Sequence, residues 1–125
     1  MALNVTRPSR FKSYGLHAIL DDTAYTAYTC PPNTVAYMSL VFVSNASSSA
    51  SDVIVQWDDD DRGTPITIIG GKNLAQAEFI QLSGSFLVLE ENDTLKITTA
   101  NTSGGNDPDV SIIVTVEEVF LPTQG

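Results

Sequence analysis

The sequence predicts an all-β fold: an antiparallel β-sandwich, jelly-roll or immunoglobulin-like, with about eight or nine strands in a single domain. Two observations favour it. Along the 125 residues, short segments rich in Val, Ile, Thr, Tyr and Phe alternate with clusters of Gly, Pro, Asn, Asp and Ser, which is the pattern of strands and turns. No stretch carries a sustained helical stripe of apolar residues, so helices are not expected.

The expected strands follow one another closely along the chain. They span residues 11–20, 23–29, 34–43, 53–58, 65–69, 77–82, 86–89, 94–98 and 110–119. Tight turns are predicted within 82–86, where Gly84 would close a hairpin, within 69–72 and within 91–94.

Alternation within these segments separates a core face from an outer face. The predicted core, with Trp57 as its main anchor, comprises Val53, Val55, Trp57, Leu87, Leu89, Leu95, Ile97, Val110, Ile112, Val114 and Val116. Ile54 and Ile113 fall on the outer faces of their strands, and the strand at 34–43 is apolar on both faces. These positions put apolar surface outward, which predicts contact with a partner as well as with the chain's own core.

Charge divides the chain into unequal parts. The predicted organisation is a basic arm at 1–12, one β-sandwich domain at 13–120 and a short tail at 121–125. Three of the six basic residues, Arg7, Arg10 and Lys12, lie in the arm, ahead of all 15 acidic residues. The arm is expected to reach an acidic neighbour, and the alternative is an ordinary frayed terminus.

Several partners are excluded by composition. A formal charge of −9 and a pI near 4.1 would repel a phosphate backbone, so nucleic acid is not an expected partner. No apolar run approaches the roughly 20 residues that span a bilayer, so no membrane contact is expected. The first residues lack the basic-then-apolar layout of a signal peptide, so the protein is expected to be soluble where it is made.

Candidate catalytic and metal-binding residues are few. His17 is the only histidine and Cys30 the only cysteine, so one chain can form neither a site with two imidazoles nor an internal disulfide. The aspartates at 58–61 offer oxygen ligands of the kind that bind Ca²⁺. Alternate strand residues share a face, so Asp58 and Asp60 are the metal candidates, and a solvated acidic turn is the simpler interpretation. No cofactor and no catalytic residue is expected.

Four stretches of the sequence resemble a known group of proteins. They are YTCPPNT at 28–34, VIVQW at 53–57, FLVLEENDTLKIT at 86–98 and DVSIIVTVEE at 109–118. Together with the long apolar strand between the first two, they are similar to small β-sandwich structural proteins encoded by tailed bacteriophages, over about residues 25–119. The resemblance implies a non-enzymatic virion protein, first of all a capsid decoration or cement protein that binds the major capsid shell, often as a trimer.

On this resemblance, the partners are the major capsid protein and like subunits, and the protein is made in the host bacterial cytoplasm and resides in the virion. The residues expected to contact a partner are Arg7, Arg10, Lys12, Ile54 and Ile113. Two alternatives remain: a structural protein of the tail, neck or fibre, and a carbohydrate-binding module, which would need an exposed platform of aromatic side chains. An enzyme is the poorest fit, because it would need a convergent set of titratable groups.

Overall fold

In a computed structural model of the chain, residues 8–17, 23–46, 50–101 and 109–121 are described, and within them the chain forms eight strands and no helix. The strands are β1 (Ser9–Leu16), β2 (Tyr25–Thr29), β3 (Thr34–Asn45), β4 (Ser51–Asp58), β5 (Ile66–Leu74), β6 (Phe79–Leu89), β7 (Thr94–Asn101) and β8 (Val110–Phe120). With no helix among these residues, none of them forms a helical membrane span.

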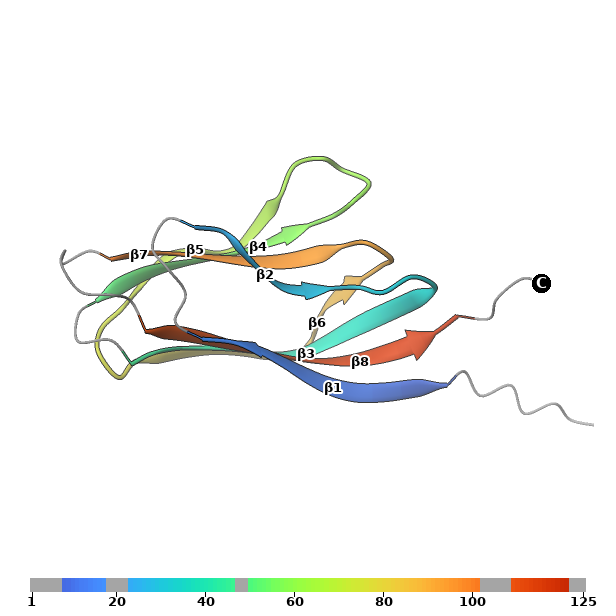
Figure 1. Cartoon of the computed structure of the whole chain (residues 1–125), viewed down its shortest axis with the longest axis horizontal. Helices are drawn as coiled ribbons and strands as arrows, with labels where there is room; N and C mark the ends of the chain where they lie inside the picture. The colour runs from blue at the N-terminus through green and yellow to red at the C-terminus, as the bar shows by residue number, and fades with distance from the viewer. Residues whose placement is uncertain (1–7, 18–22, 47–49, 102–108, 122–125) are drawn as a thin grey trace, which may run out of the picture.

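The strands form two four-stranded antiparallel sheets that pack face to face (Figure 1). The strand orders are β1-β8-β3-β6 and β2-β7-β4-β5. The strands pair as they would in one long hairpin folded across the two sheets. β1 pairs with β8, β2 with β7, β3 with β6 and β4 with β5. The predicted antiparallel β-sandwich is confirmed.

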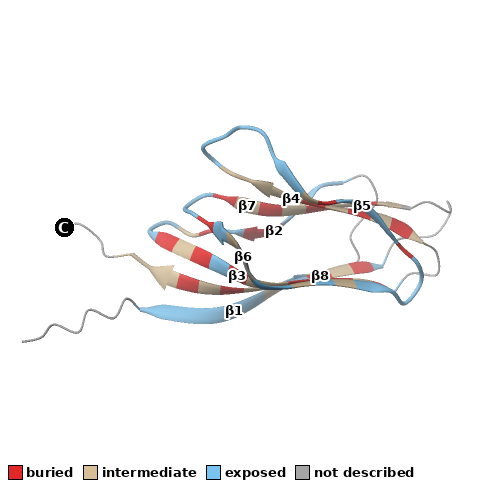
Figure 2. Cartoon of the chain, turned by 180° about the vertical axis from the view of Figure 1, so that it is seen from behind, coloured by how far each residue is buried: buried red, intermediate tan, exposed pale blue. Residues whose placement is uncertain are grey.

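The core lies between the sheets and contains most of the predicted residues. Figure 2 shows the alternation of buried and less buried positions along β8 and β3. The predicted core residues that are fully buried are Val53, Val55, Leu89, Leu95, Ile97, Val110, Ile112, Val114 and Val116. Trp57 and Leu87 are only partly buried and pack against this core from its margin. Trp57 is not the central anchor, because it lies one residue from the end of β4, where the acidic turn begins.

The hairpin predicted around Gly84 is wrong, because β6 continues through it without a break. Met38 of β3 faces Leu87, whereas Leu40, two residues further on, faces Ser83. The extra residues of β6 form a bulge, and Gly84 adopts a φ of 90° within it.

The turn predicted around Gly71 is also wrong, because β5 runs through it. Val53 of β4 faces Lys72 and Ile54 faces Gly70, so Gly71 is the extra residue of a bulge and has a φ of 82°. A glycine between apolar runs suits a bulge as well as a tight turn, and the long neighbouring strand decides between them. The turn predicted at 91–94 is confirmed.

The predicted basic arm belongs in part to the sheet. β1 begins at Ser9 and pairs with β8 along its whole length, and the Phe120 amide donates a hydrogen bond to the Pro8 carbonyl at 2.9 Å. The strand predicted at 11–20 therefore starts earlier and ends at Leu16, followed by an exposed His17. Residues 1–7 and 122–125 lie outside the described part of the chain.

Candidate functional site

The outer face of sheet β1-β8-β3-β6 carries a row of exposed side chains across its four strands, of which those on β1, β3 and β6 are aromatic or aliphatic. Phe11 on β1 faces Glu117 on β8, Glu117 faces Tyr37 on β3, and Tyr37 faces Val88 on β6. The exposed fractions are 73% for Phe11, 42% for Tyr37 and 46% for Val88. A large part of this apolar area is therefore in contact with water in the single chain.

A second apolar group lies further along the same face. Ile113 on β8 is 43% exposed and faces Phe42 on β3. The Phe42 ring stacks on Phe79 of β6 with centroids 5.2 Å apart, and Phe79 is 60% exposed. Beside these rings is a mainly apolar hollow of about 370 Å³, lined also by Ala46 and Ala77.

The side chains in the middle of this face are mostly small and uncharged. Between the two apolar groups, the Ser13 and Thr115 hydroxyls share a hydrogen bond of 2.7 Å, and Leu40 of β3 faces Thr115. Alternation and burial place one charged residue, Glu117, among the described outward positions of these four strands. We call this surface, from Phe11 to Phe79, the apolar face.

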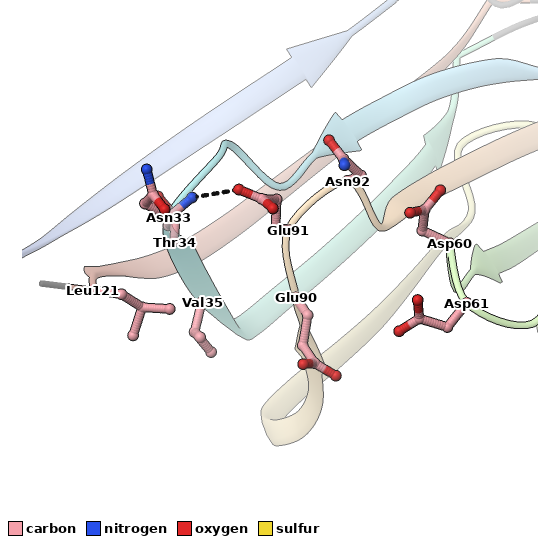
Figure 3. A pocket seen from close by; sticks show the side chains of 9 residues that line it. All are labelled: Asn33, Thr34, Val35, Asp60, Asp61, Glu90, Glu91, Asn92 and Leu121. Carbon is pink, nitrogen blue, oxygen red and sulfur yellow. Dashed lines mark hydrogen bonds between the residues drawn. The ribbon is translucent and has the colours of Figure 1, made fainter. Parts of the chain in front are cut away.

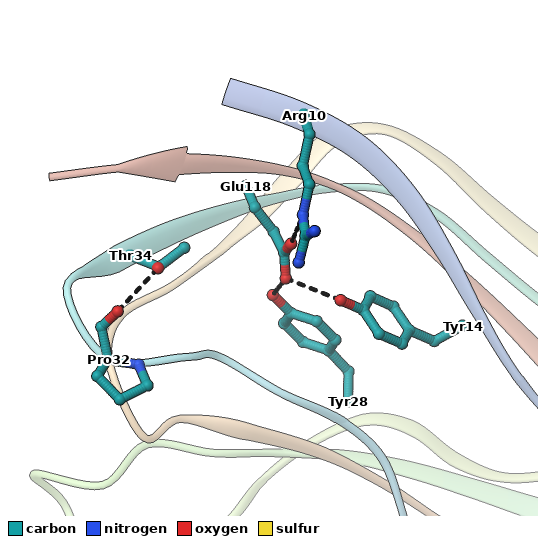
Figure 4. Close-up of polar contacts among 6 residues, drawn as sticks. All are labelled: Arg10, Tyr14, Tyr28, Pro32, Thr34 and Glu118. Carbon is teal, nitrogen blue, oxygen red and sulfur yellow. Dashed lines mark hydrogen bonds and ion pairs between the residues drawn. The ribbon is translucent and has the colours of Figure 1, made fainter. Parts of the chain in front are cut away.

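A buried carboxylate fixes β1, and with it Phe11, to the rest of the sandwich. Glu118 of β8 has no exposed surface and accepts hydrogen bonds from Arg10 Nε (2.8 Å), the Tyr14 hydroxyl (3.0 Å) and the Tyr28 hydroxyl (2.6 Å). Figure 4 shows the three donors converging on this carboxylate from β1 and β2. Because Tyr28 belongs to the other sheet, this cluster also joins the two sheets.

The electrostatics of this cluster favour an ionised carboxylate. Burial alone would raise the pKa of Glu118, but the hydrogen bonds from Tyr28, Arg10 and Tyr14 outweigh burial and hold this pKa below its ordinary value. Burial, followed by the contact with Glu118, raises the pKa of both tyrosines, so each hydroxyl remains a donor. The cluster is therefore closed around Glu118 and acts as a structural tie.

The acidic turn and the 91–94 turn form an acidic end of the sandwich. Two hollows adjoin Asp60 there, of about 300 and 380 Å³. In Figure 3 the side chains of Asp60, Asp61 and Glu90 line the first hollow, and Glu91 accepts a hydrogen bond of 2.7 Å from the Asn33 amide.

Local partners hold the carboxylates of this end. Asp58 pairs with Lys96 at 3.5 Å and Asp59 with Arg62 at 3.4 Å. The buried Asp93 accepts amide hydrogen bonds from Asp60 and Glu90. Among the residues that the structure describes, no three His, Cys, Asp or Glu side chains gather as a metal site would require.

The residues expected to contact a partner are spread over the molecule. Ile113 lies on the apolar face, whereas Ile54 lies half-buried on β4, in the other sheet, so these two do not share one patch. Arg10 is engaged by Glu118, and the Lys12 ammonium lies 5.0 Å from the centre of the Tyr14 ring. Arg7 lies outside the described residues.

Sequence reasoning missed Phe11 and Phe79 as surface residues. Alternation around Phe11 points the other way, since charged residues at Arg10 and Lys12 would place Phe11 in the core. In the structure Arg10 turns inward to the buried Glu118, which leaves Phe11 on the outer face. Phe79 gave no signal, because its outward direction depends on where β6 begins and pairs with β3.

No protein-family model and no curated protein matches the chain. Among solved structures, the chain is similar to one of Bacillus endospore appendages, which form disulfide-linked pili, with 12% identity and a TM-score of 0.55 over 98% of this chain and 96% of that one. It is similar to a chain of the IBDV viral particle, with 12% identity and a TM-score of 0.50 over 92% of this chain. It spans 36% of that viral chain.

A third similar structure is the capsid asymmetric unit of cyanophage Pam1, with 15% identity and a TM-score of 0.47, over 98% of this chain and 91% of that one. At the identities of the pilus and IBDV chains the likeness is one of fold. The chain shares its β-sandwich with structural proteins of a pilus and of a viral particle.

Proposed function

We propose that this chain is a non-enzymatic structural protein of a tailed-bacteriophage virion, and that it decorates the major capsid shell as a cement protein. The observation that carries the proposal is the apolar face. Phe11, Tyr37, Phe79, Val88 and Ile113 all expose more than two fifths of their surface there. Exposed apolar surface of this extent on one sheet face marks a protein interface in a soluble molecule.

The topology supports the virion assignment. Eight strands paired first with last, second with seventh and so on, in two sheets, make the arrangement of a jelly roll, which is a recurrent fold of viral capsid proteins. Capsid subunits work by adhesion, which needs a rigid sandwich with a complementary surface. The sequence resemblance to phage structural proteins points the same way.

The residues available for catalysis support a non-enzymatic role. Cys30 is fully buried, and its single S–H is shared between the carbonyl oxygens of Thr34 (3.3 Å) and Leu89 (3.6 Å). Burial raises the pKa of this thiol to about 11, so the nucleophilic thiolate is disfavoured at neutral pH. His17 is exposed at the end of β1.

The tyrosines weigh against the carbohydrate-binding alternative. Tyr28 is buried, Tyr14 and Tyr25 are half-buried, and Tyr37 alone of the four is exposed. A sugar platform would need several aromatic rings with polar groups beside them to orient hydroxyls. The apolar face offers phenylalanines and aliphatic side chains, which fit a protein surface better.

In the proposed role the chain adds stability to the shell by mass action, since a subunit that binds only the assembled shell shifts the equilibrium toward it. The apolar face packs on neighbouring subunits. Arg7 and Lys12, with the half-exposed Arg10, reach an acidic neighbour near the start of β1.

The test is co-sedimentation of the purified chain with undecorated phage particles. Tyr37→Glu places a second charge in the Phe11–Val88 row of the apolar face and is expected to lower particle binding at least tenfold, about 1.4 kcal/mol. Thr26→Glu, at an exposed position opposite Lys96 on the other sheet, is the matched control and should bind as the wild type does. Failure of the wild type to bind heads would contradict the decoration role, and association with tails would support the tail alternative.

The basic contact has its own test in the same assay. Lys12→Glu should weaken binding most at low salt, because screening reduces the contribution of an exposed charge as the ionic strength rises. Deleting residues 1–7 removes Arg7 while leaving β1 whole and should have the same salt signature. Equal binding of all forms at every salt concentration would remove the basic residues from the mechanism.

A further inference from the structure

The apolar face has a projecting ring at one corner and a hollow at the opposite corner. Phe11 projects from β1 at one edge of the sheet, and the hollow beside Phe42 and Phe79 lies at the other edge, where β6 begins. Across the sheet, Phe11 and Phe79 are three strand spacings of about 4.8 Å apart, and along the strands they are about six residues of 3.3 Å apart. The diagonal distance between them is therefore about 25 Å.

The area of this face is sufficient for a weak pair. Four strands are about 19 Å wide, and strands of 8 to 11 residues are about 26 to 36 Å long, which gives about 500 to 700 Å². Because the strands of the two copies cross steeply in the arrangement described below, the faces overlap over about 19 by 19 Å, and the pair covers about 700 to 800 Å² in all, the size of a weak, reversible interface.

The placement of ring and hollow suits two-fold symmetry. A two-fold axis that lies in the plane of the face, perpendicular to the diagonal from Phe11 to Phe79 at its midpoint, exchanges the two corners. Each Phe11 then lies over the hollow of the other copy, so the contact is made twice. The strands of the two facing sheets cross at a steep angle, as in orthogonal sheet packing.

Charge permits this pairing despite a net charge of −9 on each copy. The described outward strand positions of the face hold one charged residue, Glu117. Glu78, just before β6, also lines the Phe42–Phe79 hollow, and its carboxylate accepts a hydrogen bond of 2.6 Å from the Ala75 backbone amide. The acidic end lies beyond the Phe11 end of the face, where Val35 and Leu121 line its hollow. The same two-fold axis carries the two acidic ends to opposite sides of the pair. Their separation exceeds the screening length of about 8 Å at physiological ionic strength.

We infer that the apolar face is covered by a second copy of this chain, with Phe11 of each copy seated in the Phe42–Phe79 hollow of the other. This inference rests on the proposed function in so far as it names the neighbour that the apolar face contacts. The homo-oligomer that the sequence predicts is then a two-fold dimer, because a face that is covered by one copy cannot bind another. Tyr37→Glu then lowers particle binding by breaking the pair, and the pair contacts the shell through the edges and ends of the sandwich.

Disulfide trapping of the full-length chain tests the contact. Within one chain the Cα atoms of Phe11 and Phe79 are too far apart for a disulfide, which needs a Cα separation below about 7 Å. The double variant Phe11→Cys/Phe79→Cys should therefore oxidise to a covalent dimer, several-fold more than Phe11→Cys/Thr26→Cys. Cys30 is buried and common to both. Equal yields from the two variants, or a ladder of higher oligomers from the first, would overturn the two-fold pairing.

Sedimentation velocity without any particles supplies a second readout. The wild type and Thr26→Asp should form dimers as the protein concentration is raised, and Phe79→Asp and Phe11→Asp should remain monomers with unchanged circular dichroism. A monomeric wild type that still binds particles through Tyr37 would overturn this inference and leave the proposed function standing. A dimeric wild type that binds no particle would contradict the proposed function and leave this inference standing.

Discussion

The two outer faces of the sandwich have the same number of strands and opposite chemistry. The face of β1-β8-β3-β6 exposes phenylalanine, tyrosine, valine and isoleucine. The outward residues of β2-β7-β4-β5 are mainly polar: Thr26, Asp52, Gln56, Asp58, Thr67, Thr94, Lys96 and Thr98. Both sheets bury the same kind of Val, Leu and Ile side chains inward, so core formation does not account for the difference. The outer composition instead indicates what each face contacts.

The outer face of β2-β7-β4-β5, the polar face, needs no partner to cover it in water. Asp58 pairs with Lys96 across β4 and β7, and the Asn73 amide donates a hydrogen bond of 2.8 Å to the Asp52 carboxylate. Such exposed pairs add little stability, but they leave no large apolar area uncovered. The apolar face lacks this cover, and an interface with another subunit is the physical remedy.

The largest expected effect comes from loosening β1, because this strand carries Phe11 to the apolar face. Glu118→Ala removes the acceptor shared by Arg10, Tyr14 and Tyr28, and leaves the buried Tyr28 hydroxyl without this partner. We expect a loss of about 3 kcal/mol in the free energy of unfolding, the lower end of the cost of breaking a buried charged pair, since Arg10 is half exposed. Urea unfolding measures it, and a loss below about 0.5 kcal/mol would mean that the tie is unimportant.

A matched pair of isoleucines separates the two faces directly. Ile113→Asp on the apolar face should weaken self-association at least tenfold, about 1.4 kcal/mol, because it buries a carboxylate between subunits. Ile54→Asp, on the polar face, should leave association unchanged and lower only the stability of the monomer. Sedimentation equilibrium over a concentration series distinguishes them. An equal effect of both on association would mean that the two faces do not differ in role.

Local pattern was enough to predict what depends on alternation alone. Alternation places Val110 and Val116 in the core and Ile113 on the surface, because a strand reverses its side chains at every residue. The same local pattern predicts turns at Gly71 and Gly84, where the structure has bulges, because only the partner strand distinguishes a bulge from a turn.

The candidate site was predictable only in part for a related reason. Alternation places Glu118 on the core face, but its donors Arg10, Tyr14 and Tyr28 lie 90 to 108 residues away in sequence. The apolar face likewise depends on strand order, which brings Phe11 of the first strand and Phe79 of the sixth onto one sheet. Such pairings are set by the whole fold, and no local motif encodes them.

The pH dependence of stability tests whether the buried Glu118 carboxylate is charged. The folded-state pKa of Glu118 is depressed, so its contribution is present above the unfolded pKa, about 4.3, and is lost as pH falls through the folded value. Wild type should therefore be more stable than Glu118→Gln at pH 7, and the difference should shrink as the pH is lowered below 4. Comparing the two proteins cancels the titration of the other carboxylates. A difference that stays constant from pH 7 to pH 3 would contradict a charged Glu118.

The smallest expected effect concerns the acidic end. Asp58 and Asp59 are each held by a basic side chain, and Asp93 is occupied by two backbone amides, so few free oxygens converge for a hard cation. Adding millimolar Ca²⁺ should raise the thermal midpoint by less than about 2 °C, which for a domain of this size is under about 0.5 kcal/mol. A ligand that binds the native state alone must raise its stability, so a clear upward shift would reveal a site. Asp60→Asn is the control: a shift that disappears in this variant would assign the ion to the hollows beside Asp60 and give the acidic end a function of its own.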